Sequence, residues 1–162
     1  EDEKELGVCL IDIGGGTTDV AIFAGGSIRY TAVIPVAGDQ ITNDIAMALR
    51  TPTAEAETIK LQHGVALRHL TDPQQMIEVP GVGERGSRTM SRHTLAEVIV
   101  PRVEELYSLA LAEMRRSGWA DRLSSGVVIT GGAATMPGIW VSIFWLMLPA
   151  SSPRRVKRSL SC

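Results

Sequence analysis

A glycine-rich stretch near the start of the printed sequence constrains the fold more than any other feature. The apolar run 8–13 contains Asp12, the turn Gly14-Gly15-Gly16 follows with two threonines, and a second apolar run begins after Asp19. Glycine permits positive φ and lets a ligand approach the main chain, and successive amides in such a turn form a concave anion site. The stretch therefore predicts a phosphate-holding turn with one carboxylate, that of Asp12, at its root.

The residues after the glycines separate this turn from other phosphate-binding motifs. In dinucleotide-binding folds and P-loops a helix follows the glycines, and its N-terminus meets the phosphate. Here Asp19 replaces the third glycine of the dinucleotide pattern, and the next residues suit a strand that ends at Gly25-Gly26. The sequence thus predicts a strand–turn–strand unit rather than a Rossmann or Walker site. The alternative is an ordinary glycine-rich hairpin that binds nothing.

Composition excludes several classes of function. The 162 residues suffice for one domain or two small ones, and the 44% that are hydrophobic can form a core. A net charge of −2 argues against a nucleic-acid partner. The two cysteines, Cys9 and Cys162, form neither a disulfide framework nor a zinc motif, which fits a reducing compartment. The apolar run 139–148 is too short to span a bilayer.

Hydrophobic periodicity predicts alternating strands and helices along the chain. Strands are expected over 8–13, 19–24, 27–36, 76–79 and 126–130. Helices are expected over about 41–49 and 54–63, after Gly131-Gly132, and from about 91 or 94 to 117. In the longest helix, Thr94 and Glu97 suit a capping box, and Pro101 should kink the helix or mark its true start.

Two further features admit both a bland and a functional interpretation. Glu57 and Lys60 lie three residues apart on one helix face, and this spacing alone favours a surface ion pair. Gly131-Gly132 follows a short buried strand, and most such turns merely connect elements. In a nucleotide cleft, however, a second turn of this kind lets a nucleoside approach bare backbone.

Several motifs together resemble those of the bacterial cell-division family FtsA, within the actin, Hsp70 and sugar-kinase superfamily. They are the D-x-G-G-G-T-x-D motif at 12–19 and three other stretches, 38–46, 56–64 and 129–134. The stretches 78–80, 91–92 and 95–106, the last with its Pro-Arg, separate FtsA from the pilus protein PilM, the rod-shape actin and Hsp70 chaperones. The resemblance covers about residues 6–138.

The resemblance implies an actin-like, RNase H-like α/β ATPase fold, of which this chain holds only subdomains 2A and 2B. Subdomain 2A is expected at 6–50 and 119–138, and subdomain 2B at 51–118. FtsA-like proteins bind ATP and Mg²⁺, polymerise into filaments, and tether the FtsZ ring to the inner membrane. The implied location is the cytoplasmic face of that membrane, at the division site.

The family's functional residues carry over by position. Asp12, the implied catalytic residue, would act through Mg²⁺-bound water, because a carboxylate with a water shell suits this ion. The other implied nucleotide contacts are Gly14, Gly15, Gly16, Thr17 and Thr18 for phosphates, Glu57 and Lys60 for the nucleoside, and Gly131, Gly132 and Ala133 along the nucleotide. The implied contacts to the FtsZ C-terminal tail are Arg88, Arg102 and Glu105.

The sequence departs from the family pattern at both ends. No first phosphate motif precedes Leu6, so the chain is expected to be a fragment that binds nucleotide weakly and is at most a weak ATPase within a full-length protein. Residues 139–162 form an apolar and then basic tail, which suggests a shifted reading frame near 139. Real divergence and a membrane-surface element are the alternatives for this tail.

Three other functions remain open from the sequence. A sugar-kinase-like phosphotransferase could use the same hairpin, but it needs a substrate-binding acid or base that the sequence does not identify. A PilM-like pilus-assembly actin homologue shares the hairpin without the stretch 95–106. A fragment that only presents an interaction surface is the third.

Overall fold

The glycine-rich turn joins two antiparallel strands of a five-stranded mixed sheet. The computed structural model describes residues 2–83, 86–147 and 156–158. The sheet consists of β1 (Val8–Ile13), β2 (Thr18–Ala24), β3 (Ser27–Ile34), β6 (Val127–Thr130) and β7 (Val156–Arg158), in the order β3-β2-β1-β6-β7. β1 pairs antiparallel with β2, and Ile13 lies opposite Thr18. The predicted strand–turn–strand unit is confirmed.

The two glycine motifs meet at one end of this sheet. β6 runs parallel to β1, with Thr130 opposite Asp12. Parallel strands end on the same side of a sheet, so Gly131 and Gly132 follow β6 beside the hairpin glycines that follow β1. A register of this kind cannot be read from the sequence, because more than a hundred residues separate the two strands.

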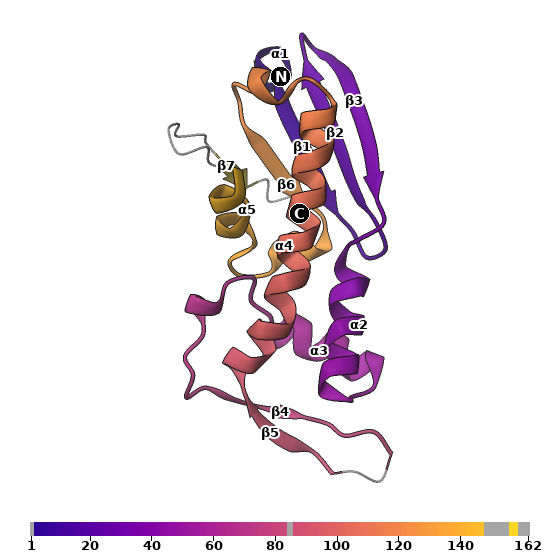
Figure 1. The fold of residues 1–162 in the computed structure, drawn as a ribbon, viewed down its shortest axis with the longest axis vertical. Helices are drawn as coiled ribbons and strands as arrows, with labels where there is room; N and C mark the ends of the chain where they lie inside the picture. Colours follow the sequence, from indigo (N-terminus) through magenta and orange to yellow (C-terminus); the bar gives the residue numbers. More distant parts are fainter. Residues whose placement is uncertain (1, 84–85, 148–155, 159–162) are drawn as a thin grey trace.

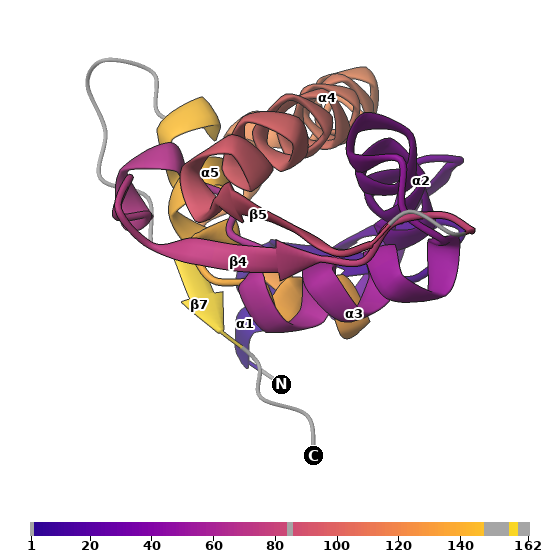
Figure 2. The same ribbon diagram turned by 90° about the horizontal axis from the view of Figure 1, so that it is seen from below.

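Helices continue from this end of the sheet. α2 (Gly38–Leu49) and α3 (Thr53–His63) lie beyond the hairpin turn, and α1 (Asp2–Leu6) lies at the opposite end of the molecule (Figure 1). A separate hairpin of β4 (Met76–Val79) and β5 (Arg88–Ser91) extends past α3 (Figure 1), and it runs alongside α3 when the molecule is seen from below (Figure 2). The short helices η1 (Arg68–Leu70), η2 (Ala120–Arg122) and η3 (Gly132–Thr135) complete the connections.

The longest helix, α4 (Arg92–Arg116), links the two ends of the molecule (Figure 1). Its N-terminal cap is Ser91, whose hydroxyl accepts a hydrogen bond from the amide of His93 at 3.1 Å. The predicted capping box at Thr94 is therefore wrong, because the helix has already begun there. Pro101 does not mark the start either: the helix runs through it, although proline cannot donate the bond that its position requires.

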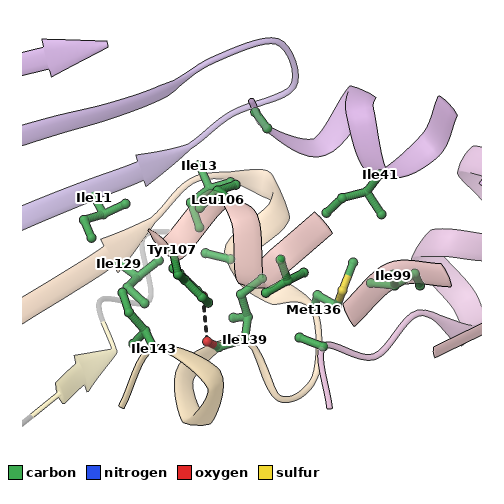
Figure 3. Packing of buried hydrophobic residues seen from close by; sticks show 14 of the residues in the cluster. Ile11, Ile13, Ile41, Ile99, Leu106, Tyr107, Ile129, Met136, Ile139 and Ile143 are labelled. Atoms are coloured by element: carbon green, nitrogen blue, oxygen red, sulfur yellow. Dashed lines mark hydrogen bonds between the residues drawn. The ribbon is translucent and has the colours of Figure 1, made fainter. Parts of the chain in front are cut away.

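The core lies between the sheet and α4. Ile11, Ile13 and Ile129 of β1 and β6 pack with Leu106 and Tyr107 of α4 (Figure 3). Cys9, on the same strand as Ile11, is fully buried. Burial raises the pKa of the Cys9 thiol to about 12, so it stays protonated and packs as a small apolar residue.

The beginning of the predicted aberrant tail is part of this core. α5 (Ile139–Met147) places Ile139, Ser142 and Ile143 on one buried face, and Val141 on the exposed side. The hydroxyl of Ser142 donates to the carbonyl of Ala66 at 3.0 Å. Within residues 139–143, one side of the helix is therefore buried and the other is exposed. The frameshift remains a hypothesis for the rest of the tail, where 148–155 and 159–162 lie outside the described residues. Among the helices that the structure describes, none is long and apolar enough to cross a membrane.

Tyr107 provides a test of how α5 is docked. Its fully buried hydroxyl donates to the carbonyl of Ile139 at 2.6 Å (Figure 3). We expect Tyr107→Phe to lower the free energy of unfolding by about 1 kcal/mol, the typical net value of one hydrogen bond, as measured by urea denaturation. Ser108→Ala, which removes an exposed local hydroxyl from the same helix, is the control. An unchanged unfolding midpoint in Tyr107→Phe would contradict this docking.

Candidate functional site

The N-terminus of α2 holds the glycine turn in place. Within the turn, the amide of Gly14 donates to the carbonyl of Thr17 at 3.0 Å. The first two amides of α2 then donate to the carbonyls of the turn: Gly38 to Gly14 at 3.0 Å, and Asp39 to Gly15 at 2.8 Å. Helix N-terminal amides lack partners within the helix, so these bonds satisfy them and fix the direction of the turn.

The opposite side of the turn is left with free donors. Within the described residues, the amides of Gly15 and Gly16 donate no hydrogen bond. The same is true of Gly132 and Ala133, at the start of η3. Unpaired backbone amides in such turns attract anions, so the two glycine motifs offer two sets of donors at the same end of the sheet.

A cavity of about 200 Å³ lies between these motifs and the helices. Six of the predicted site residues line it: Gly14, Gly15, Glu57, Lys60, Gly132 and Ala133. The other residues that line it are Gly38, Asp39, Leu61, Thr135, Met136 and Pro137. The hairpin, both helices after it and the second glycine motif thus converge on one hollow.

The two threonines after the glycines have different surroundings. Thr18 is fully buried, and its hydroxyl donates to the carbonyl of Val36 at 2.7 Å. Thr17 is exposed, and its hydroxyl donates to the Asp19 carboxylate at 3.4 Å. Neither lines the cavity. The hydroxyl of Thr18 is committed to anchoring the hairpin, so a phosphate contact predicted for this residue cannot come from its side chain.

Lys60 is the centre of a buried polar network. Its ammonium group donates to the carbonyl of Gly38 at 3.1 Å, to the hydroxyl of Thr42 at 2.8 Å and to the carboxylate of Glu57 at 2.7 Å. An ammonium group has three protons, so all three are used within the protein. Lys60 is only 8% exposed. The ion pair that spacing predicted does form, but it lines the cavity instead of lying on the surface.

Glu57 completes this network and stays ionised. Thr42 donates a short hydrogen bond to the same carboxylate oxygen that Lys60 contacts. Burial acts to raise the pKa of Glu57, but the hydrogen bonds from Lys60 and Thr42 and the charge of Lys60 outweigh it, so the pKa is lowered. The second carboxylate oxygen of Glu57 makes no hydrogen bond within the described residues, and 42% of the side chain is exposed.

Asp12 and Gly131 lie close together where β1 and β6 end. Gly131 has a φ of +95°, and a Cβ atom there would lie 2.3 Å from the carbonyl oxygen of Ile13 and 2.5 Å from Oδ1 of Asp12. Only glycine fits this close approach. Asp12 is exposed and lies beside the cavity without lining it.

The surroundings of Asp12 fit a hydrated cation better than one held by several protein ligands. No group of three or more His, Cys, Asp or Glu residues that could hold a metal lies together in the described ranges. Mg²⁺ commonly keeps several waters and uses one or two carboxylates. The exposed carboxylate of Asp12 suits that second arrangement.

The three predicted partner residues lie away from the cavity and already have contacts within the protein. Arg102 of α4 binds both oxygens of Asp44 on α2, at 2.6 and 3.0 Å, and Glu105 at 2.5 Å. These hydrogen bonds, first of all those to Asp44, raise the pKa of Arg102 further. Arg88 of β5 donates to the carbonyl of Leu49 at the end of α2. These contacts clamp α2 to α4 and to the β4–β5 hairpin.

Sequence reasoning assigned no role to two residues that the structure places in the site. Asp39 lines the cavity, and Thr42, 4% exposed, bridges Lys60 and Glu57. The signal was present, since both belong to the motif at 38–46 that begins α2. Their separation of three residues puts them on one helix face, but nothing in the sequence said that this face meets α3.

Comparison with known proteins gives a consistent family match. A family model described as cell division protein FtsA matches residues 9–142. The chain is 61% identical over 138 residues to the cell division protein FtsA of Pseudomonas aeruginosa, covering 85% of this chain and 33% of that protein. It is 49% identical over 146 residues to that of Escherichia coli, covering 86% and 35%. The chain thus spans about a third of the length of the curated relatives it matches.

Solved structures with a similar fold belong to the actin-like group. MreB5 of Spiroplasma citri bound to AMPPNP superposes with a TM-score of 0.78 at 24% identity, covering 95% of this chain and 49% of that one. The MamK double helical filament gives a TM-score of 0.75 at 15% identity, covering 95% and 50%. These likenesses concern the fold alone, and they confirm the predicted actin-like α/β class.

The lowered pKa of Glu57 predicts a pH-dependent stability. At pH 7, Glu57→Gln should lower the free energy of unfolding by about 1 kcal/mol, because Lys60 loses its anionic partner. The wild-type advantage should be fully present above the ordinary value of 4.5 and disappear as pH falls through the lower pKa of the folded state. Denaturant unfolding at several pH values measures this difference.

The exposed Glu104 provides a control for this experiment. Glu104→Gln should leave stability within about 0.5 kcal/mol of wild type at every pH. A deficit of Glu57→Gln that is as large at pH 3 as at pH 7 would mean that the ionised carboxylate is not what stabilises the network.

Proposed function

The chain belongs to the FtsA family of cell-division proteins, and we propose that it forms the part of an actin-like ATPase that holds one side of a bound ATP. The observation that carries this proposal is the cavity where the free amides of both glycine motifs meet the Lys60–Glu57 network. Backbone amides suit phosphates, and the carboxylate of Glu57 suits the hydrogen-bond donors of a nucleoside.

We assign a role to each group of residues in and beside the cavity. Gly15 and Gly16 donate to the phosphates from the hairpin, and Gly14 gives the turn its shape. Gly132 and Ala133 lie along the nucleotide, where the lack of a bulky side chain lets it approach the backbone. Gly131 lets this second turn pack against β1. Lys60, whose protons are all used, supports Glu57 and Gly38 instead of binding phosphate itself.

Asp12 fits the group that the family implies at this place. Its exposed carboxylate at the end of β1 would hold Mg²⁺ through bound water. When bound, the ion supplies positive charge that neutralises the phosphates. The carboxylate lies next to Gly131, and it would attract the cation to that side of the cavity.

The proposal includes a weak interaction and no turnover for this chain alone. The chain spans about a third of the length of its curated relatives, and we expect two-sided contact with a nucleotide to require groups of the full-length protein. We therefore expect saturable but weak binding of ATP with Mg²⁺, and no hydrolysis above a protein-free control. In the full-length protein, hydrolysis is at most slow.

We extend the proposal to the full-length protein on the basis of family membership. It polymerises on the cytoplasmic face of the inner membrane at the division site, and there it tethers the FtsZ ring. The similarity to MamK, solved as a double helical filament, supports self-association. The proposed contacts of the FtsZ C-terminal tail are Arg88, Arg102 and Glu105. Because Arg102 clamps α2 to α4, substitutions there should affect stability as well as binding.

Blocking the cavity tests the proposed nucleotide site. A Cβ atom at Gly132 would meet no atom within 4 Å, and neither would one at Gly86 between the β4 and β5 strands. Gly132→Val should therefore fold but fill part of the cavity, weakening binding of ATP with Mg²⁺ about tenfold or more. Gly86→Val should bind like wild type. Titration followed by NMR chemical shifts measures both dissociation constants.

The outcome also discriminates between the competing functions. Saturable ATP binding that Gly132→Val weakens supports the proposal, whereas equal affinities in both variants would place the nucleotide elsewhere. Turnover of ATP that depends on an added sugar would favour a phosphotransferase. Binding of an FtsZ tail peptide without any ATP binding would leave only an interaction surface.

A further inference from the structure

The polar side chains that line the cavity leave few free hydrogen-bonding atoms for a ligand. Three of the four that line it are engaged: Lys60 uses all its protons, Thr135 donates to the carbonyl of Gly132 at 2.8 Å, and one oxygen of Glu57 accepts from Lys60 and Thr42. Asp39 is the fourth. Within the described part of the chain, its carboxylate makes no hydrogen bond or ion pair.

The polar side-chain atoms around the cavity that have no partner within the described residues are therefore hydrogen-bond acceptors only. They are both carboxylate oxygens of Asp39 and the second oxygen of Glu57, all on cavity-lining residues. An ionised carboxylate can accept but not donate, so these atoms suit hydroxyl or amino groups and disfavour phosphate. The free backbone amides have the opposite preference. One ligand that satisfies both sets must carry an anionic part and, next to it, hydrogen-bond donors.

The position of Asp39 indicates which donors these are. Its amide is fixed to the carbonyl of Gly15 at 2.8 Å. Its carboxylate leans over the hairpin, because a Cβ atom at Gly15 would lie 3.1 Å from Oδ1, and one at Gly16 would lie 3.9 Å from Oδ2. The acceptors of Asp39 thus lie directly beside the amides proposed for phosphate. In a nucleotide, the sugar is the part next to the phosphates, and the base lies farther away.

We propose that Asp39 is a specificity-determining residue that reads the ribose: its carboxylate accepts a hydrogen bond from a sugar hydroxyl of the bound nucleotide. The chain then prefers a ribonucleotide over the corresponding deoxyribonucleotide. Glycine at position 15 is part of this arrangement, since the 3.1 Å approach leaves little room for a side chain there. The inference rests on the proposed nucleotide site and adds to it the recognition of the sugar.

The ordinary alternative is that Asp39 only stabilises α2. An acidic residue in the first turn of a helix interacts favourably with the helix dipole, and Asp39 occupies such a position. That role predicts lower stability on substitution, equally for every ligand. It does not predict that one sugar hydroxyl matters. Asp2, an exposed acidic residue in the first turn of α1, is therefore the matched control.

The experiment compares four ligands with the 162-residue chain: ATP, 2′-deoxy-ATP, 3′-deoxy-ATP and inorganic tripolyphosphate, each with Mg²⁺. Dissociation constants come from NMR titrations of wild type, Asp39→Ala, Asp39→Asn and Asp2→Ala. In wild type, at least one deoxynucleotide should bind about tenfold more weakly than ATP, as expected for loss of a charge-assisted hydrogen bond. Asp39→Ala should abolish that difference and leave tripolyphosphate unchanged.

Asp39→Asn separates hydrogen bonding from charge. Its amide oxygen still accepts, so part of the ribose preference should remain, whereas Asp2→Ala should retain all of it. A ribose preference that persists in Asp39→Ala overturns the inference. So does an equal loss for tripolyphosphate, which would assign the carboxylate to the phosphates or the cation, and so does tighter binding of every ligand, which would show simple repulsion.

The two proposals fail in different ways. If wild type binds ATP but does not distinguish it from either deoxynucleotide, the inference about Asp39 fails and the nucleotide site stands. If wild type binds neither the nucleotides nor tripolyphosphate, the nucleotide site fails, and the inference fails with it.

Discussion

The contact between the first amides of α2 and the carbonyls of the glycine turn is the interaction on which the rest of the site depends. Gly38 and Asp39 donate to Gly14 and Gly15. These bonds satisfy a helix N-terminus and, at the same time, turn the carbonyls of the hairpin toward α2. The amides of Gly15 and Gly16 are left without a partner among the described residues. A glycine hairpin becomes a candidate phosphate site here because a helix occupies its other side.

A second constraint follows from the first, because the same turn of α2 carries Thr42. Its hydroxyl joins Lys60 to Glu57, and Lys60 in turn binds the carbonyl of Gly38. A buried ammonium group is tolerated only when it is paired and hydrogen-bonded, and this network meets that condition completely. Lys60 therefore has a supporting role. The groups left to face a ligand are backbone amides, which suit a phosphate, and carboxylate oxygens, which suit a hydroxyl donor.

Much of the fold could be predicted because its signals are local. Strands β1, β2, β3, β4 and β6 and helices α2, α3 and α4 were all expected close to where they lie. Two local expectations were wrong: Ser91 caps α4 before Thr94 can, and the helix begins well before Pro101 and not at it. The buried face of α5 was missed because Ile139 and Ile143 become a stripe only once Tyr107 and Ala66 define which side is inside.

By itself, the sequence determined the strand–turn–strand unit, the place of Asp12 just before its glycines and the resemblance to the FtsA family, because glycines, β-branched residues and motif spacing act over a few positions. Only the tertiary structure decided which of the candidate residues can face a ligand. It buried the hydroxyl of Thr18, used all the protons of Lys60, and placed the Asp39 carboxylate beside the turn with no hydrogen bond to any other residue that the structure describes. The reason is physical: the hydrogen-bonding capacity of a polar group is finite, and its partners come from elements that are distant in the chain.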